Sequence, residues 1–121
     1  MDEKLKNVKV VSIKNDIITF YNGAMLYSEH EQDCCEYHYL SVADLTLDDF
    51  DGLEFDISDS NFFERIKDYG IALKPLNGHP VRIPGYGSNN GYYSENLTLV
   101  LEFSNGVRRE YDITDCQEVK G

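Results

Sequence analysis

The chain has 121 residues, 41% of them hydrophobic, and its 22 acidic and 11 basic side chains give a net charge of −11. A chain of this length usually forms one domain and buries about two-thirds of its unfolded surface, so we expect a single domain over residues 1–121. No apolar stretch approaches the ~18 residues of a membrane span, and the charged N-terminus lacks the apolar segment of a secretory signal. Three cysteines, two of them adjacent, make a poor disulfide framework, so we expect a reducing cytoplasm.

The excess negative charge lies in residues 15–64, which contain 13 Asp or Glu and no Lys or Arg. Residues 1–14 carry four Lys and two acidic side chains, and residues 65–121 carry seven basic and seven acidic ones. Such a surface repels the phosphates of nucleic acids and of membranes, so we expect neither as a partner. It attracts cations or a basic protein surface, although a merely solvated acidic face explains the same composition.

Strands dominate the first forty residues. The β-branched residues between positions 8 and 13 predict an opening strand. A hairpin follows, in which the apolar runs 17–20 and 24–27 flank Asn22-Gly23. Asn and Gly both tolerate the positive φ that a type I′ turn needs at its two central residues. Residues 35–40 predict a further strand.

Helix signals are few and lie in the middle of the chain. Residues 46–49 are typical of a capped first turn, but Gly52 stops any helix early. Asp59 or Ser60 is a candidate cap for a second helix, which would run through Tyr69 and end before Gly70. We therefore expect one or two short helices.

The second half of the chain again predicts hairpins. Residues 71–73 and 81–83 flank Asn77-Gly78, and residues 97–103 and 107–113 flank Asn105-Gly106. The last run alternates like a half-buried strand, although Arg109 interrupts its apolar face. The expected fold is α+β but mainly β, an antiparallel meander or small sandwich with one or two short helices.

A faint internal repeat relates two of these hairpins. Residues 20–36 and 103–118 share a Phe before an Asn-Gly pair, then a Tyr, and then an Asp-Cys string. The ordinary likeness of hairpins explains this similarity. A true repeat would place Cys34 or Cys35 and Cys116 at related positions, where they could approach each other.

A segment rich in His and Cys is the first candidate site. His30, Cys34 and His38 are spaced four and four, which places them on one face of a strand and nearly so on a helix. Imidazole and thiolate suit zinc, whose structural sites usually have four ligands. We therefore consider a zinc site with His30 and Cys34 or Cys35 among its ligands. Cys116, a carboxylate or water would supply the fourth ligand.

The same segment permits two other interpretations. Cys34 or Cys35 could be a nucleophile activated by His30, with Asp33 or Glu36 orienting the imidazole. The neighbouring carboxylates oppose this, because they raise the pKa of a thiol that would have to ionise. In the other interpretation, one cysteine fills the core and the histidines sit at the rim of the sheet.

A predicted loop rich in Gly, Asn and Tyr, over residues 84–94, is the second candidate site. It lacks the glycine spacing and the Lys-Ser/Thr pair of a phosphate-binding loop. Tyrosines among Gly, Ser and Asn are typical of protein-binding loops, because they combine rigid amphipathic rings with adaptable polar groups. Alternatively, the tyrosines fold back onto the core. The predicted partner-binding residues are Tyr86, Asn89, Asn90, Tyr92 and Tyr93.

An acidic run is the third candidate. Its carboxylates could hold calcium or magnesium, but the ligand order and central Gly of an EF-hand are not reproduced, and a solvated face explains it better. The run consists of Asp48, Asp49, Asp51, Glu54, Asp56 and Asp59.

Two strings together resemble a family of small uncharacterised proteins of phages, prophages and their bacterial hosts. They are His30-Glu31-Gln32-Asp33-Cys34-Cys35-Glu36 and, followed by Leu97-Thr98-Leu99, Asn89-Asn90-Gly91-Tyr92-Tyr93-Ser94. The resemblance extends from about residue 17 to residue 113, and His38 is less typical of it. It implies a bacterial or phage cytoplasm and a role in host takeover or counter-defence, with no activity to transfer.

The sequence thus favours a small acidic, non-enzymatic binding protein. It would use the acidic segment and the tyrosine-rich loop against a protein partner, and its charge could imitate that of nucleic acid. The alternative is a zinc-binding domain, structural or weakly catalytic. The oligomeric state stays open.

Overall fold

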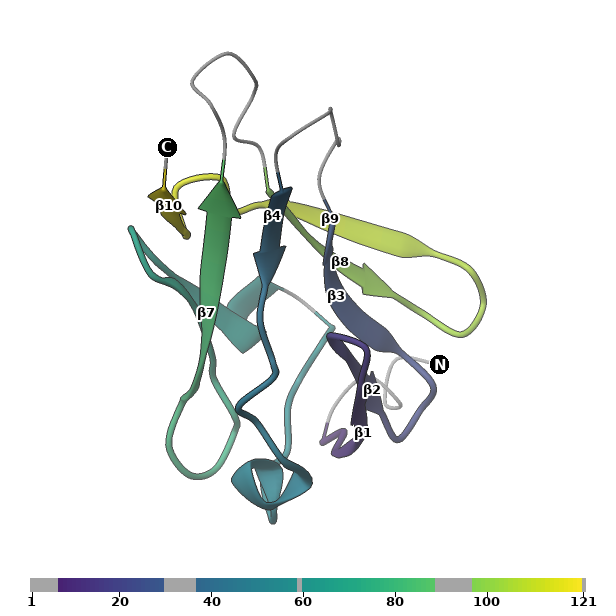
Figure 1. Ribbon diagram of the computed structural model, residues 1–121. Helices are drawn as coiled ribbons and strands as arrows, with labels where there is room; N and C mark the ends of the chain where they lie inside the picture. Colours follow the sequence, from purple (N-terminus) through teal and green to yellow (C-terminus); the bar gives the residue numbers. More distant parts are fainter. Residues whose placement is uncertain (1–6, 30–36, 59, 89–96, 121) are drawn as a thin grey trace.

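The computed structural model describes residues 7–29, 37–58, 60–88 and 97–120 (Figure 1). Within these ranges the chain forms ten β-strands and two short 3-10 turns, and it contains no α-helix. The elements are β1 (Val10–Lys14), β2 (Ile17–Phe20), β3 (Met25–Glu29), β4 (Tyr37–Leu40), η2 (Leu47–Phe50), η3 (Ser60–Phe62), β5 (Phe63–Ile66), β6 (Gly70–Leu73), β7 (Val81–Ser88), β8 (Thr98–Glu102), β9 (Arg108–Asp112) and β10 (Glu118–Lys120).

The described strands form two sheets, and the prediction of a mainly β fold is confirmed. The first sheet has the order β1-β2-β3-β8-β9, and all its pairs are antiparallel. The second has the order β10-β7-β6-β5, with β4 paired to β7 as well. Its pairs are antiparallel except for the short strand β10, which runs parallel to β7.

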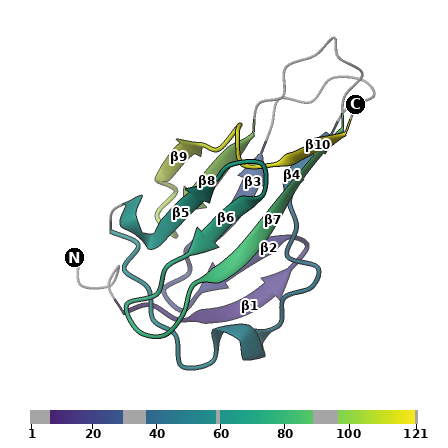
Figure 2. The ribbon, with the colours of Figure 1, turned by 90° about the vertical axis from the view of Figure 1, so that its left-hand side faces the viewer.

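Strand β7 is paired along both of its edges (Figures 1 and 2). The amide of Gly85 donates to the carbonyl of Tyr69 at 2.6 Å, whereas the carbonyl of Pro84 accepts from Ser41 at 2.8 Å. Successive residues of a strand direct their backbone groups to opposite edges, so these two bonds mark opposite edges of β7. Strand β6 and then β10 therefore share one edge, and β4 occupies the other.

The tightest hairpin is one that the Asn-Gly pattern did not predict. Strands β1 and β2 are joined by Asn15 and Asp16, with φ of 55° and 62°, which is the conformation of a two-residue type I′ turn. Asp tolerates this left-handed region better than most residues because its short side chain bonds locally.

Two predicted Asn-Gly corners are hairpins, but of another turn type. Only the glycines adopt positive φ, 90° at Gly23 and 92° at Gly106, which makes each corner a three-residue loop with a glycine bulge. The Asn22 side chain accepts from the Ala24 amide at 3.1 Å, and the Asn105 side chain accepts from Val107 at 3.0 Å. The two corners have the same pattern of backbone hydrogen bonds. They also abut, since a Cβ at Gly23 would lie 3.2 Å from that of Ser104.

The helix predicted from Asp59 or Ser60 to Tyr69 is wrong. After η3, residues 63–66 form β5, which pairs antiparallel with β6 in the register Phe63↔Leu73 to Ile66↔Gly70. The spacing of the aromatic residues fits a helix as well as a strand. Residues 63–66 form a strand because the neighbouring strand β6, every residue of which is buried, offers them a hydrophobic partner.

Hydrogen bonds with the side chain of Asn77 hold the connection between β4 and η3. η2 ends early, as predicted, and its Thr46 amide donates to the Asp49 carboxylate at 2.8 Å. Asn77 then holds the following residues, because its side chain donates to the Gly52 carbonyl at 2.8 Å and accepts from the Glu54 amide at 2.9 Å. Asn77-Gly78 is thus part of a long β6–β7 connection and not a tight corner.

Apolar side chains from both sheets form the core. Phe55 is fully buried and lies against Phe20 and Phe50, with ring centroids 6.1 and 6.2 Å apart. At one margin, the Leu40 amide of β4 donates to the Ser28 hydroxyl of β3 at 2.8 Å. This bond links the two sheets, between which the described strands form no ladder.

At the other margin, an aromatic seam joins β5 to β9. Tyr111 packs on Phe62 and Phe63, with centroid distances of 5.9 and 5.2 Å. Arg109 points inward, as the alternation predicted, because its guanidinium lies 5.1 Å from the Phe103 ring and donates to the Ser58 carbonyl at 2.5 Å. A cation on an aromatic face with a hydrogen-bonded partner is accommodated where a lone buried charge would not be.

Replacing Gly85 by Ala tests the close approach on which β7 depends. An added Cβ would lie 2.4 Å from the Cys116 carbonyl oxygen, so the chain that leads into β10 would have to move. We expect a loss of more than about 3 kcal/mol in the free energy of unfolding. The control is Gly106→Ala, where nothing lies within 4 Å of the Cβ and the positive φ alone costs about 1 kcal/mol. Equal losses in urea unfolding would contradict the close approach.

Candidate binding site

Three side chains form a row across the outer face of the second sheet. In the ladders of β7, Tyr39 of β4 is paired with Tyr86, and Tyr86 is paired with Glu118 of β10. Directly paired residues project on the same face, so these three stand side by side. We call them the tyrosine row.

The opposite face of the same strands is buried. Leu40, Ile83, Gly85 and Gly87 alternate with the row and are all buried. Tyr39 is 36% exposed, Tyr86 is half-buried and Glu118 is exposed. The alternation therefore fixes the row on the outside, because a slip of one residue would expose Leu40 and Ile83 to water.

The two tyrosine rings contact each other. Their centroids are 5.9 Å apart and their planes are tilted by 46°. This tilted arrangement is a favourable one for aromatic pairs. The pair thus presents a preformed aromatic surface beside a carboxylate.

The row lies on strands that flank the predicted zinc segment and the predicted tyrosine-rich loop. Tyr37, which follows residues 30–36, is paired with Ser88, which precedes residues 89–96. The other flank of each segment is also paired, because Glu29 of β3 is opposite Thr98 of β8. The strands that flank the two segments are therefore paired with each other.

Most of the predicted site residues lie outside the described residues. Of the predicted partner-binding set, the structure describes Tyr86 alone, and of the predicted zinc ligands Cys116 alone. The others lie outside the described residues: His30, Cys34, Cys35, Asn89, Asn90, Tyr92 and Tyr93. The backbone of His38 is paired with Gly87 in β4.

Tyr39 and Glu118 belong to the site but were not predicted. Tyr39 lies in a segment that the sequence did predict as a strand, and its neighbour Leu40 is an evident core residue. The alternation of that strand was therefore sufficient to put Tyr39 on the outside. Nothing in the sequence indicates that Glu118 reaches the row, because that depends on the parallel pairing of β10.

Cys116 is buried beside a polar hollow. Its side chain is 2% exposed, and the adjoining hollow of about 190 Å³ is lined by Arg65, Asp112, Thr114 and Asp115 among others. Burial raises the pKa of the Cys116 thiol, and this outweighs a hydrogen bond from the Ile66 backbone and the positive charge of Arg65, which both lower it. A buried thiol with a raised pKa is a weaker nucleophile at neutral pH than an exposed one.

The polar groups around the hollow make contacts that stabilise the local structure. The Arg65 guanidinium lies 5.3 Å from the Phe63 ring and donates to the Asp112 carbonyl at 2.9 Å. Hydrogen bonds from the Thr114 hydroxyl and amide, at 2.5 and 3.0 Å, lower the pKa of the Asp112 carboxyl. These contacts hold the turn that carries the chain from β9 towards β10.

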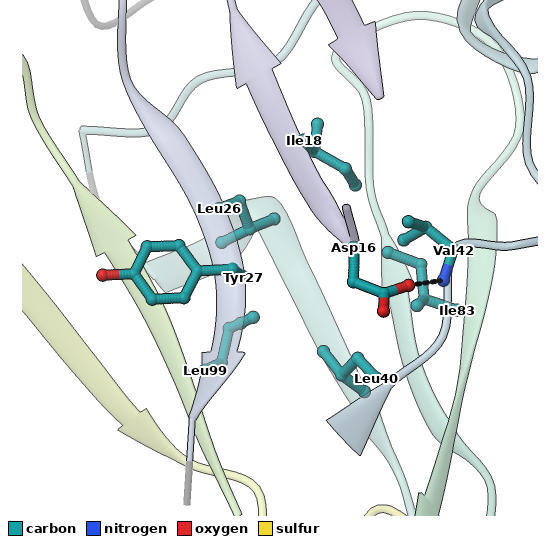
Figure 3. Close-up of a pocket in the computed structure, with 8 residues that line it drawn as sticks. All are labelled: Asp16, Ile18, Leu26, Tyr27, Leu40, Val42, Ile83 and Leu99. Carbon is teal, nitrogen blue, oxygen red and sulfur yellow. Dashed lines mark hydrogen bonds between the residues drawn. The ribbon is translucent and has the colours of Figure 1, made fainter. Parts of the chain in front are cut away.

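A second pocket lies inside the molecule, between the sheets (Figure 3). Its volume of about 10 Å³ is that of about one water molecule. The Asp16 carboxylate at its edge accepts from the Val42 amide at 3.3 Å, while the ring of Tyr27 points away from it. Apolar side chains make up the rest of the lining: Ile18, Leu26, Leu40, Val42, Ile83 and Leu99. The space is too small for a substrate.

The acidic run lies on the surface around η2. Asp48, Asp49 and Asp51 are exposed, and Asp49 caps its own turn through Thr46. Glu54 accepts from the Asn7 side chain at 2.8 Å. Within the described ranges, no group of three or more His, Cys, Asp or Glu side chains is arranged to hold a metal ion. A zinc site at His30, Cys34, Cys35 and Cys116 stays a prediction.

Comparison with protein families gives one match. The model of Domain of unknown function (DUF7448) matches residues 3–99, which include β1 to β7 and the start of β8. The chain belongs to this family. No curated protein and no solved structure is significantly similar to it. The match confirms that the chain is a member of an uncharacterised family.

No helix in the part of the chain that the structure describes is long and apolar enough to cross a membrane. The tyrosine row lies partly outside the matched range, because Tyr39 and Tyr86 are inside it and Glu118 follows it.

The raised pKa of Cys116 predicts how its thiol titrates. The folded state keeps the proton to a higher pH than the unfolded state, so the contribution of this group to stability falls as pH rises from its ordinary pKa through the raised one. In a Cys34→Ser/Cys35→Ser background, we expect alkylation by iodoacetamide to be slower and to have a more alkaline midpoint in the native protein than in urea. A native midpoint at or below the unfolded one would contradict the burial argument.

Proposed function

We propose that this DUF7448 protein is a non-enzymatic binding protein that contacts a basic protein surface. Its binding face is the tyrosine row on β4, β7 and β10. The observation that carries the proposal is the Tyr39–Tyr86 pair on the outside of β4 and β7.

The composition of this face supports a protein partner. Interfaces are enriched in tyrosine, which contributes a large contact area with few rotatable bonds and a polar tip. The rings are already in contact with each other and are carried by paired strands, so little conformational entropy is lost on binding.

The charge of the chain supports a basic partner surface. The net charge is −11, and residues 15–64, which include β4, hold 13 acidic side chains and no Lys or Arg. Long-range attraction of this kind speeds association and selects basic surfaces. Proteins that bind nucleic acids have such surfaces, so an acidic binder can occupy them by imitating the charge of nucleic acid.

The setting of this proposal is the cytoplasm of a bacterium or of a phage-infected cell. There the protein would act in host takeover or counter-defence by occupying a host protein. The absence of an enzymatic role is part of the proposal. It rests on the chemistry of the described polar groups, which stabilise turns and seams.

Affinity capture with matched variants tests this function. The tagged full chain is used as bait in bacterial lysate, beside Tyr39→Ala/Tyr86→Ala and the control Tyr21→Ala. Tyr21 is 81% exposed at the Asn22-Gly23 corner, which precedes β3 and so lies far from Glu29 and the row. We expect a captured protein whose affinity falls at least tenfold in the double variant and is unchanged in the control, as for hot-spot tyrosines.

The salt dependence of the capture gives the second readout. An electrostatically guided complex should weaken as ionic strength rises from about 0.1 M towards 1 M, because the Debye length falls from about 10 to 3 Å. Capture that is equally reduced by Tyr21→Ala, or unaffected by both the double variant and salt, would contradict the proposed face. Melting temperatures of all variants are measured to separate binding from folding.

A further inference from the structure

We propose that the tyrosine row binds an arginine side chain of the protein partner, with the guanidinium on the Tyr39 and Tyr86 rings and against the Glu118 carboxylate. This assignment rests on the proposed function and names the group that is recognised. Three observations support it: the geometry of the row, the way in which this chain holds its own arginines, and the distance of those arginines from the row.

The geometry of the row matches the two things that a guanidinium seeks. Adjacent strands lie about 4.8 Å apart, so the carboxylate of Glu118 stands one strand from the Tyr86 ring, and Tyr39 stands one strand from it on the other side. A guanidinium is planar, stacks on aromatic faces and presents several N–H donors in its plane. It can therefore lie on a ring while donating sideways to a carboxylate.

The chain already uses this combination twice inside its own fold. Arg65 lies 5.3 Å from the Phe63 ring and donates to the Asp112 carbonyl, and Arg109 lies 5.1 Å from the Phe103 ring and donates to the Ser58 carbonyl. In both cases an aromatic face and an oxygen hold one guanidinium. The tyrosine row presents two rings and a charged oxygen, which is the stronger version of the same arrangement.

An arginine at the row has to come from another molecule. The chain has four arginines, and the structure describes all of them. Arg65 and Arg109 are held in the seam between β5 and β9, and Arg108 is bonded to Glu29 at 2.9 Å and lies 3.5 Å from Glu110. Arg82 is on the same face of β7 as Tyr86, but four residues away, which is about 13 Å along a strand.

Lysine is the competitor that the row discriminates against. An ammonium is strongly hydrated and has no plane to stack, so it gains less from a ring and a carboxylate together than a guanidinium does. The discrimination between the two cations is therefore the distinctive property of the site. A merely acidic surface would attract both equally.

Nuclear magnetic resonance on the full chain tests the assignment with two small probes, Nα-acetyl-arginine amide and Nα-acetyl-lysine amide. We expect the arginine probe to shift the ring signals of Tyr39 and Tyr86 at concentrations where the lysine probe shifts them several-fold less. The ring of Tyr21 should respond to neither. Glu118→Gln should weaken the arginine response about two- to fivefold, as for an exposed ion pair.

Further variants keep the test independent of folding. Tyr86→Leu should abolish the response, and Tyr39→Leu serves as the second variant if the first lowers the melting temperature strongly. Equal responses to the two probes, equal shifts at Tyr21, or an unchanged response in Glu118→Gln would overturn the assignment. Shifts that depend on protein concentration alone would give the row to a second copy of the chain and overturn it equally.

The two proposals fail in different ways. If a protein is captured through the tyrosines but the arginine and lysine probes act alike, the proposed function stands and the arginine assignment falls. If the arginine probe is selected but the captured proteins do not depend on Tyr39 and Tyr86, the assignment stands as a property of the row and the proposed function falls.

Discussion

The pairing of β7 along both edges is the constraint on which the other parts of the structure depend. Buried backbone amides and carbonyls must be paired, because each one left without a partner costs about 1–3 kcal/mol. Strand β7 meets this requirement with β6 and β10 on one edge and β4 on the other. Gly85 makes this arrangement sterically feasible, since any Cβ there would collide with the Cys116 carbonyl.

The same strand couples the core to the candidate binding face. Ile83 is fully buried on the inner face of β7, while Tyr86 projects outward between Tyr39 and Glu118. Because side chains alternate strictly along a strand, the burial of Leu40 and Ile83 fixes the register and with it the tyrosine row. The candidate binding face is therefore carried by strands that pack on the core, and its composition depends on three strands from distant parts of the chain.

Local patterns predicted much of the fold because they depend on neighbours in sequence. The apolar runs on both sides of Asn22-Gly23 and Asn105-Gly106 are strands β2, β3, β8 and β9. The turn type was wrong, since only Gly23 and Gly106 adopt positive φ and the asparagines bond to the backbone instead. The true type I′ turn at Asn15 and Asp16 was missed because this pair lacks the glycine that makes Asn-Gly and Asp-Gly strong turn signals.

Long-range pairing explains the remaining differences. Residues 63–66 have a spacing that fits a helix, and only the apolar strand β6 beside them makes a strand the better choice. In the site, Tyr86 was predicted as part of a loop over residues 84–94, whereas residues 84–88 belong to β7. Tyr39 and Glu118 join it through pairings across 47 and 32 residues. Cys116 was a reasonable zinc ligand by residue type, yet its burial beside Arg65 emerges only when β9, β5 and β10 are brought together.

Proton–proton contacts measured in solution on the full chain test the three-strand row most directly. Nuclear Overhauser effects should connect the rings of Tyr39 and Tyr86 and should connect the Tyr86 ring to the side chain of Glu118. Contacts from the Tyr86 ring to Ile83 and Leu40 in their place would mean that the strand has slipped by one residue. That result would contradict both the register of β7 and the binding face derived from it.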